Sequence, residues 1–285
     1  MFYYYINIAD ISIEIESPVS IVFQEKILPF CRKKGNSPDL TYKILSGRVE
    51  NGESVVSKAE YSIEKKDNRY IRVKKMFQCG QMQETFLLQE KPGIYHLYIP
   101  QDCMKEGHLF DRENVLDFLA LEEGLLQNHA FILHASVVSW KGNGILFTAP
   151  SGTGKSTQAE LWHRYHGADI LNGDRAIIRR TDGTYRVYGS PYAGSSGIYR
   201  NQSAPVRAVI ILEQSQENQI SRCFGKEAFV PLFRETLMNS WSRNYMSAMT
   251  ELIGNAAAEI PVYHLACHPD KEATDLVRKN LEKGA

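Results

Sequence analysis

The segment Ala149–Thr157, APSGTGKST, has the residue types and spacing of a phosphate-binding loop. In such a loop the backbone N–H groups converge on phosphate oxygens, a lysine reaches the terminal phosphates and a hydroxyl binds Mg²⁺. The lysine here is Lys155 and the hydroxyl is that of Ser156. The expected nucleotide-binding residues are Ser151, Gly152, Thr153, Gly154, Lys155, Ser156 and Thr157.

The loop departs from the usual pattern at its first residue, where Ala149 replaces glycine. Alanine is tolerated wherever the backbone does not need a positive φ. The two glycines that approach the phosphates most closely, Gly152 and Gly154, are present. A β-rich run, residues 145–148, precedes the loop, and residues 156–165 favour a helix whose positive end would face the phosphates. The motif therefore still predicts nucleotide binding.

A nucleoside triphosphate site also needs an acidic group for its metal ion. Asp174 follows Lys155 by nineteen residues, enough for a helix, a turn at His166–Gly167 and a strand returning beside the loop strand. We expect Asp174 and Ser156 to hold Mg²⁺. The alternative is a turn aspartate, which the preceding asparagine and glycine would favour on their own.

The order of LHASVV, APSGTGKST and LNGDR resembles that in HPr kinase/phosphorylase and, more distantly, in ATP-dependent phosphoenolpyruvate carboxykinase. The likeness is nearest to the HPr-kinase-like peptide kinases of bacterial peptide-modification clusters. It covers residues 130–180 well, continues more weakly to 283 and does not reach the N-terminal part. The resemblance implies an ATP- and Mg²⁺-dependent serine kinase with a peptide or small-protein acceptor. It also implies functional roles for His134, Lys155 and Ser156.

The acidic motif differs from that of these kinases, which carry two adjacent aspartates before an arginine. Here Gly173 and Asp174 precede Arg175, so one carboxylate is missing and reversible phosphorolysis is not expected. Asp174 could be the metal ligand or the base. A strand would place His134 and Ser136 on one face, where His134 could take the acceptor's proton; the alternative is a core histidine.

Two arginines could neutralise charge on the transferred phosphoryl group. Arg175 follows Asp174 directly, and Arg200 lies in the long Gly-, Ser- and Pro-rich stretch 190–205. Long loops of this kind are often functional. Alternatively, Arg175 pairs with a neighbouring carboxylate and Arg200 is exposed to solvent.

The hydrophobic pattern divides the chain near residue 110. Residues 1–110 alternate apolar and polar side chains between turn residues, which predicts a mainly antiparallel β module for substrate recognition or assembly. Residues 111–285 alternate strand-like and helix-like runs, which predicts an α/β nucleotide-binding domain of the HPr-kinase/carboxykinase type. We expect an α/β fold class, α+β for the chain as a whole.

The composition excludes several classes of partner. Lys and Arg number 33 and Asp and Glu also 33, which does not favour nucleic acid or an anionic membrane surface. No run reaches the roughly 18 apolar residues of a membrane helix. Five scattered cysteines suit reduced thiols in the cytoplasm. Open sheet edges in the N-terminal module would suit a homo-oligomer.

Three classes of function follow from these observations. The first is an ATP-dependent kinase acting on a serine of a peptide or small protein. The second is a kinase or carboxykinase-like enzyme acting on a small metabolite, and the third is a nucleotide-binding regulatory protein with little catalysis. The sequence leaves the acceptor, and the choice between ATP and GTP, open.

Overall fold

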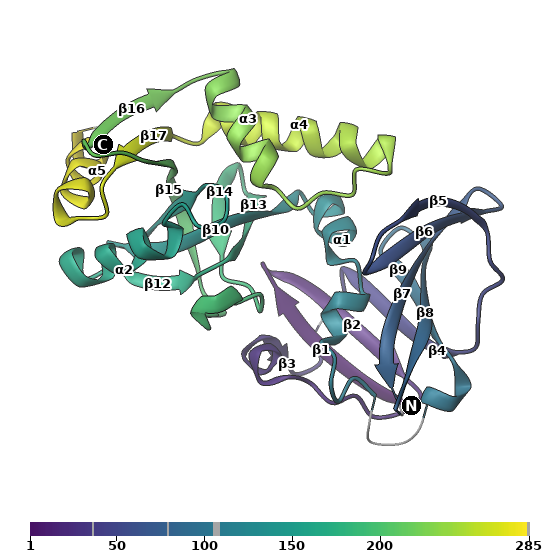
Figure 1. Ribbon diagram of the computed structural model, residues 1–285. Helices are drawn as coiled ribbons and strands as arrows, with labels where there is room; N and C mark the ends of the chain where they lie inside the picture. The colour runs from purple at the N-terminus through teal and green to yellow at the C-terminus, as the bar shows by residue number, and fades with distance from the viewer. Residues whose placement is uncertain (36, 79, 105–108, 284–285) are drawn as a thin grey trace. The chain divides into compact units, whose positions relative to one another are not determined.

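The chain folds into two compact units. The computed structural model describes residues 1–35, 37–78, 80–104 and 109–283. Unit 1 is Met1–Gln127 and unit 2 is Asn128–Ala285 (Figure 1). The boundary lies after Gln127 rather than near residue 110, because the segment from 115 to 127 packs on the N-terminal sheet. There, Gly124 lies so close to Leu40 that a Cβ on it would be 2.5 Å from the leucine side chain.

Unit 1 is built on one nine-stranded sheet, counted over the described residues, with the order β3-β1-β2-β4-β9-β8-β7-β6-β5. All neighbouring strands are antiparallel except β4, which is parallel to both β2 and β9. The mainly antiparallel character expected from the alternation is therefore confirmed. Its elements are β1 (Phe2–Ile8), β2 (Ile11–Ser17), η1 (Glu25–Phe30), β3 (Cys31–Arg32), β4 (Leu40–Ser46), β5 (Glu53–Ser57), β6 (Tyr61–Lys66), β7 (Arg69–Gln78), β8 (Gln81–Lys91), β9 (Ile94–Ile99), η2 (Gln101–Cys103), η3 (Val115–Phe118) and α1 (Leu121–Gln127).

The first alternating stretch of the sequence contains a turn that the alternation does not reveal. Ala9 and Asp10 both have φ of 56°, the left-handed conformation that two-residue hairpins of type I′ require. The chain therefore reverses there, and β1 pairs with β2 in an antiparallel hairpin. Every second residue of β2 is buried, so this strand contributes a continuous apolar row to the core of unit 1.

Helix α1 brings two acidic side chains under the sheet of unit 1. Arg72 on β7 donates a hydrogen bond to Glu122 at 2.6 Å, and both side chains are largely buried. Burial raises the pKa of the neighbouring Glu123 to about 7; the Glu122 charge acts in the same direction and Arg72 opposes it. Folding therefore favours the protonated form of Glu123.

Unit 1 should lose stability as pH rises through neutrality. The pKa of Glu123 goes from 4.5 to about 7 on folding, so its contribution is fully present below 4.5 and is lost as pH rises through 7. Glu123→Gln should remove a pH dependence on the order of 2 kcal/mol in the free energy of unfolding. Far-UV circular dichroism during urea unfolding at pH 5 and pH 8 measures it. The control Glu84→Gln, at an exposed position on β8, should keep the wild-type dependence; an unchanged dependence in Glu123→Gln would contradict the assignment.

Unit 2 combines a mixed sheet with five helices, counted over its described residues. The strand order is β11-β10-β13-β14-β15-β17-β16, with β12 beside β10 and β11 also beside β15. The α/β fold class is thus confirmed. The elements are β10 (Ala130–Trp140), β11 (Asn143–Thr148), α2 (Lys155–His166), β12 (Asp169–Asn172), β13 (Arg175–Thr181), β14 (Thr184–Tyr188), η4 (Gly194–Ser196), β15 (Ser203–Gln214), β16 (Gln219–Cys223), α3 (Lys226–Glu235), α4 (Arg243–Glu259), β17 (Val262–Cys267) and α5 (Lys271–Lys283).

Three strands of this sheet, including the one that leads into the phosphate-binding loop, run parallel to one another. β11 is parallel to β15, and β15 is parallel to β17. Helices α2 and α5 share one hydrophobic cluster with these strands, in which Trp162 of α2 and Val277 of α5 are fully buried. The loop between β11 and α2 is therefore anchored at both ends by the core.

The strand that returns after α2 does not lie directly beside β11, as the sequence spacing suggested. β12 pairs with β10, and β10 separates it from β11. Strand β16 was not expected from the sequence; it forms an antiparallel edge next to β17.

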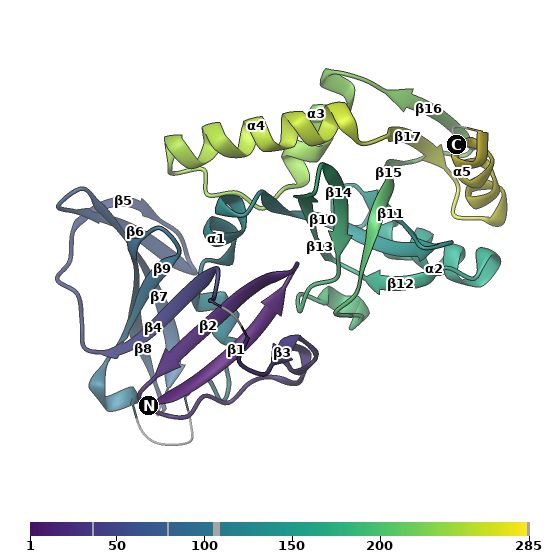
Figure 2. The same cartoon turned by 180° about the vertical axis from the view of Figure 1, so that it is seen from behind.

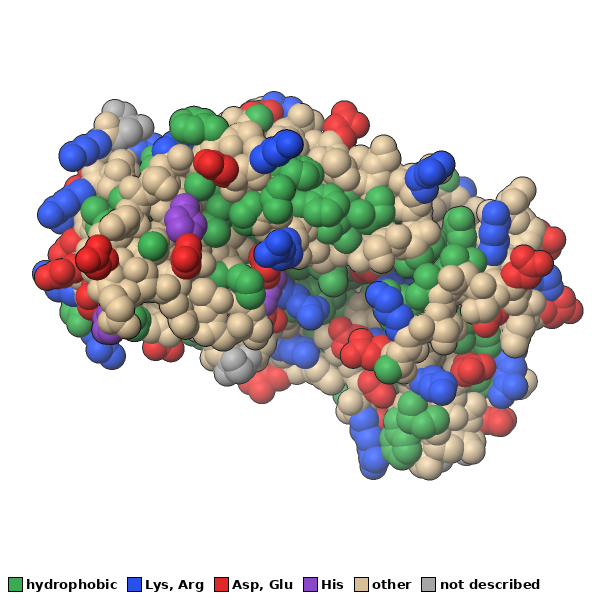
Figure 3. Space-filling view, turned by 45° about the horizontal axis from the view of Figure 1, so that its top comes forward, with side chains coloured by type: hydrophobic (Ala, Val, Ile, Leu, Met, Phe, Trp, Pro, Cys, Tyr) green, Lys and Arg blue, Asp and Glu red, His purple; other side chains and the backbone are tan. Residues whose placement is uncertain are grey.

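Helices α3 and α4 pack against each other in unit 2 (Figure 2). Hydrophobic side chains gather over these two helices in the space-filling view (Figure 3). Phe224, Val230 and Leu237, in and around α3, are the large apolar side chains of this region that are exposed.

No helix within the described ranges is long and apolar enough to cross a membrane. The four cysteines that the structure describes, Cys31, Cys103, Cys223 and Cys267, are free thiols. Cys79 lies outside the described residues.

Candidate functional site

The loop after β11 has the backbone of an anion-binding loop. Gly152 and Gly154 have φ of 82° and 116°, values that favour glycine, and a Cβ on either would meet only open space. Ala149 lies before these residues, 2% exposed, and its methyl group joins the hydrophobic cluster beneath α2. The replacement of the first glycine is therefore accommodated by packing, while both left-handed positions keep glycine.

Helix α2 presents its N-terminal amides without a side-chain cap. Gly154 is the N-cap residue, and no side chain among the described residues caps this end of the helix. The N–H of Gln158 is the first to bond back along the helix, to Gly154 O at 2.9 Å. The preceding amides, those of Lys155, Ser156 and Thr157, therefore have no intrahelical acceptor. Together with the helix dipole, they make this end attractive to an anion.

Lys155 lies folded against its own loop. Its side chain is largely buried, and its ammonium group donates to Ala149 O at 2.8 Å and to Pro150 O at 3.2 Å. Burial lowers the pKa of Lys155 below its ordinary value, and the nearby carboxylates of Glu235 and Asp174 act in the opposite direction. The lysine thus lies within electrostatic range of two acidic groups.

Strand β10 carries the histidine expected from the sequence, beside Asp174. Ala135 on this strand donates its N–H to Asp174 O at 2.8 Å, and Ser136 donates its hydroxyl to Gly173 O at 2.9 Å. These bonds hold the turn after β12 against β10. As a result, His134 Nε2 lies 3.5 Å from Asp174 Oδ1, at the strand edge opposite β11.

A second carboxylate, Glu235, completes the cluster and was missed by the sequence reasoning. Its Oε2 lies 3.0 Å from His134 Nδ1. Glu235 ends α3, and the next residues run beside β10: Thr236 forms a bridge with Leu133, and Leu237 N donates to Ile132 O at 2.9 Å. No motif marks this glutamate, because it lies 101 residues from His134 in the chain and reaches it only through the bridge between Thr236 and Leu133.

The contacts of His134 favour one tautomer of the neutral ring. An ionised carboxylate can only accept hydrogen bonds, and Glu235 lies closer to Nδ1 than Asp174 does to Nε2, which favours the proton on Nδ1. In the neutral ring the Nε2 atom then has a free lone pair, and it faces Asp174. The ring is thereby oriented for taking up a proton on the Asp174 side.

Residue 173 has no room for a side chain. A Cβ on Gly173 would lie 1.9 Å from Ser196 Oγ and 2.5 Å from Ser196 Cβ. A Cβ on Gly194 would in turn lie 2.6 Å from Asp174 Cβ. The loop around η4 therefore fills the volume that a second aspartate side chain would occupy.

Asn172 fastens this loop to the turn that carries Asp174. Its Nδ2 donates to Ser190 O at 3.0 Å and to Tyr192 O at 3.1 Å. Its Oδ1 accepts from the N–H groups of Asp174 and Arg175, at 2.9 and 2.8 Å. The side chain is fully buried, so one amide connects the loop and the acidic residue in a dry environment.

The two arginines that the sequence singled out behave differently. Arg175 Nε lies 3.7 Å from Asp174 Oδ2, and its guanidinium stands over the Tyr192 ring. Arg200 does not join the cluster, because its guanidinium lies 3.5 Å from Asp169 Oδ1, at the other end of β12. The structure thus brings together Lys155, His134, Asp174 and Arg175 but not Arg200.

Other histidines of unit 2 make individual contacts. His163 and His166 contact Ala168 O and the Thr274 hydroxyl, respectively, and His264 contacts Glu213. Burial lowers the pKa of His166. Within the described residues, no group of three His, Cys, Asp or Glu side chains is arranged to hold a metal ion by itself.

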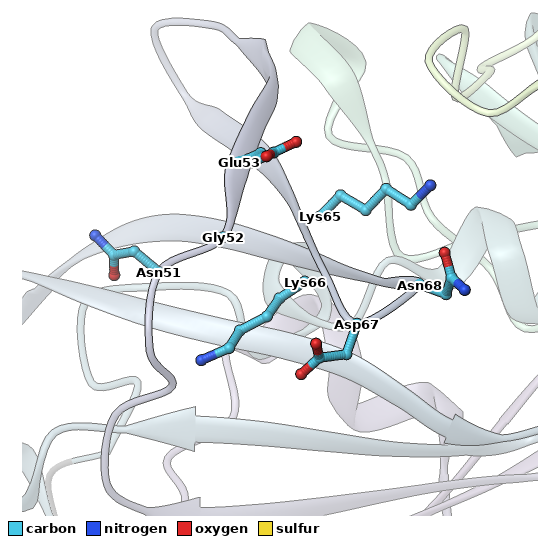
Figure 4. A pocket seen from close by; sticks show the side chains of 7 residues that line it. All are labelled: Asn51, Gly52, Glu53, Lys65, Lys66, Asp67 and Asn68. Atoms are coloured by element: carbon cyan, nitrogen blue, oxygen red, sulfur yellow. The ribbon is translucent and has the colours of Figure 1, made fainter.

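Unit 1 has a hollow of its own, next to the β6–β7 hairpin (Figure 4). Its volume is about 680 Å³. Lys65 and Lys66 point to different sides of it, as neighbours on a strand do. Lys66 pairs with Glu50, and Glu64 accepts from Gly52 N at 2.9 Å. The lining side chains drawn in Figure 4 do not converge on one point, in contrast to the cluster of unit 2.

Comparison with known proteins gives the family. The model of the family described as SynChlorMet cassette protein ScmC matches residues 119–270. This span is more than half of the chain and contains the loop, β10, Asp174 and Glu235. The chain belongs to the ScmC family.

Among solved structures, this ScmC-family chain is similar to the HPr(Ser) kinase/phosphatase from Coxiella burnetii. The identity is 12%, and the match covers 53% of this chain and 93% of that one, with a TM-score of 0.33. A search of curated proteins gave no match.

Gly173→Ala should destabilise unit 2, because its methyl group would overlap Ser196. Overpacking of this kind costs about 1–3 kcal/mol in the free energy of unfolding. Adding Ser196→Gly should restore most of the loss. All three tryptophans, Trp140, Trp162 and Trp241, lie in unit 2, so tryptophan fluorescence during urea unfolding reports on this unit.

The matched control is Gly254→Ala in α4, where a Cβ meets open space. This change should leave unit 2 as stable or raise its stability by up to about 1 kcal/mol, since alanine is the better helix former. If Gly173→Ala proved as harmless as the control, the steric account of the glycine at this position would be wrong.

Proposed function

We propose that this protein transfers the terminal phosphoryl group of ATP to a serine hydroxyl of a peptide or small protein. One observation carries the proposal: the uncapped N-terminus of α2 and Lys155 lie beside a histidine held between two carboxylates. The N-terminus of α2 and Lys155 suit the binding of a triphosphate. The histidine and its two carboxylates suit the removal of a proton from an attacking hydroxyl.

The residues of the loop fit a nucleotide with its metal ion. The glycines leave open space at the left-handed positions, so the backbone can approach phosphate oxygens closely. Mg²⁺ is usually held by one or two carboxylates together with the substrate's phosphates. Asp174 and the Ser156 hydroxyl would hold it here, and the bound ion would neutralise charge on the phosphate oxygens.

Lys155 would act by exchanging its partners. Its ammonium group now donates to two loop carbonyls, Ala149 O and Pro150 O. Terminal phosphates above the loop would offer stronger, charged acceptors. The lysine would then stabilise the negative charge of the transferred group, with Arg175 on the Asp174 side of the site.

His134 would receive the proton during transfer. Glu235 would accept the Nδ1 hydrogen, which would leave the Nε2 lone pair available. The acceptor oxygen forms a bond to the terminal phosphorus while the bond from that phosphorus to the bridging oxygen breaks. The acceptor proton passes to Nε2, and ADP leaves with the bonding electrons. Asp174, facing the same nitrogen, would stabilise the positively charged ring.

Two observations support a serine of a peptide or small protein as the acceptor. The order of LHASVV, APSGTGKST and LNGDR resembles that of kinases with such acceptors. The family is also described as a cassette protein, which fits a partner encoded in the same cassette. Unit 1 would recognise the acceptor or support assembly of a homo-oligomer.

The decisive assay combines purified full-length chain, Mg²⁺, γ-labelled ATP and serine-containing peptides encoded beside the gene. Label on a peptide serine is the expected result. Lys155→Ala should reduce transfer by roughly 100-fold or more, because it removes a charge aimed at the transferred group. Label only on a small metabolite, or ATP binding without any transfer, would contradict the proposal.

Glu235→Gln should lower the transfer rate by roughly 10–100-fold while leaving the dissociation constant for ATP nearly unchanged. The carboxylate orients His134 and does not form part of the phosphate loop. Glu227→Gln is the matched control, at an exposed position in the first turn of the same helix, and should have no effect. Equal loss of ATP binding and of rate in Glu235→Gln would show a structural role in place of the one proposed.

A further inference from the structure

A cavity of about 550 Å³ opens on the other side of the phosphate loop from His134. One wall is formed by the loop and the first turn of α2, and the other by residues 214–216 after β15 and 267–269 after β17. β11 has β10 at one edge and β15 at the other, so the cavity and the acidic cluster flank the loop on opposite sides. A ligand whose phosphates lie on the loop can therefore contact the cavity at one end and the acidic cluster at the other.

The position of the cavity is typical of ligand sites. It lies at the carboxyl ends of three parallel strands, β11, β15 and β17, where open α/β sheets bind small molecules. Its volume falls in the range of small-molecule pockets, about 300–1,000 Å³. Leu212 and Pro269 give its lining apolar surface against which a flat ring can pack.

Gln214 holds the two walls of the cavity together. Its Nε2 donates to Gly152 O and to Thr153 O, both at 3.4 Å. These bonds tie the end of β15 to the phosphate loop. The loop and the opposite wall are thus in direct contact through one side chain.

Gln158, which lines the cavity, has a buried hydrogen-bond acceptor without a partner. Its side chain is 2% exposed, and its Nε2 donates to Cys267 Sγ at 3.4 Å. Its Oε1 is buried and makes no hydrogen bond with the described residues. A buried polar atom without a hydrogen bond is unfavourable, so a ligand that donates to it gains affinity. The group that fits is an N–H donor on an otherwise flat, apolar ring.

We propose that this cavity binds the nucleobase of the triphosphate and that Gln158 Oε1 accepts a hydrogen bond from the exocyclic amine of adenine. Guanine carries an oxygen where adenine carries this amine, so the site prefers ATP to GTP. The inference rests on the proposed nucleotide site at the same loop. It also gives the nucleotide a direction, with the base beside β15 and β17 and the terminal phosphate beside His134.

The test is calorimetric titration of the full-length chain, in the presence of Mg²⁺, with ATP, GTP, purine riboside triphosphate and inorganic tripolyphosphate. ATP should bind at least about tenfold more tightly than GTP and than purine riboside triphosphate, which lacks the amine. Gln158→Leu should bring the ATP and GTP affinities to within about threefold of each other and leave tripolyphosphate binding unchanged. The exposed Gln219→Leu on β16 is the matched control and should keep the wild-type preference.

The outcomes separate this inference from the proposed function. Binding of all four ligands with equal affinity, or a preference for GTP, would overturn the base assignment while leaving the phosphate loop in place. Binding of none of them would overturn the nucleotide site itself. The purine riboside comparison uses the wild-type chain, so it decides the question even if Gln158→Leu does not fold.

Discussion

The 3.0 Å contact between His134 Nδ1 and Glu235 Oε2 joins β10, the neighbour of the strand that leads into the phosphate loop, to the end of α3. It depends on a short stretch of backbone pairing, in which Thr236 bridges Leu133 on β10. In the neutral imidazole the contact favours a proton on Nδ1, because the carboxylate can only accept. The free nitrogen is then directed at Asp174, and the proposed chemistry follows from that orientation.

The order of strands around β11 gives the loop two different sides. β10 lies at one edge of β11 and brings the titratable groups, while β15 lies at the other edge and brings the cavity lining. A phosphate chain across the N-terminus of α2 would extend between them. The sheet therefore separates a region suited to proton transfer from one suited to a flat, partly apolar ring.

Two separate elements supply the carboxylates around His134. The turn that carries Asp174 has no room for a side chain at residue 173, because Ser196 occupies the space that a Cβ there would need. Glu235 brings a second carboxylate to His134 from a different element. The negative charges beside the phosphate loop thus come from the turn after β12 and from the end of α3. Contacts with β10 hold these two segments in place. The buried side-chain amide of Asn172 connects the loop after β14 to the turn that carries Asp174.

The sequence alone determined the local parts of this protein. The glycine spacing of the loop, the helix after it and the alternation in unit 1 follow from backbone preferences and periodicity, which act over a few residues. It also indicated that His134 and Asp174 belong near Lys155. Only the tertiary structure decided that Glu235 meets His134, that Arg200 pairs with Asp169 and that Gln158 lines a cavity. These contacts depend on strand order and on packing between distant segments, and no local pattern in the chain encodes them.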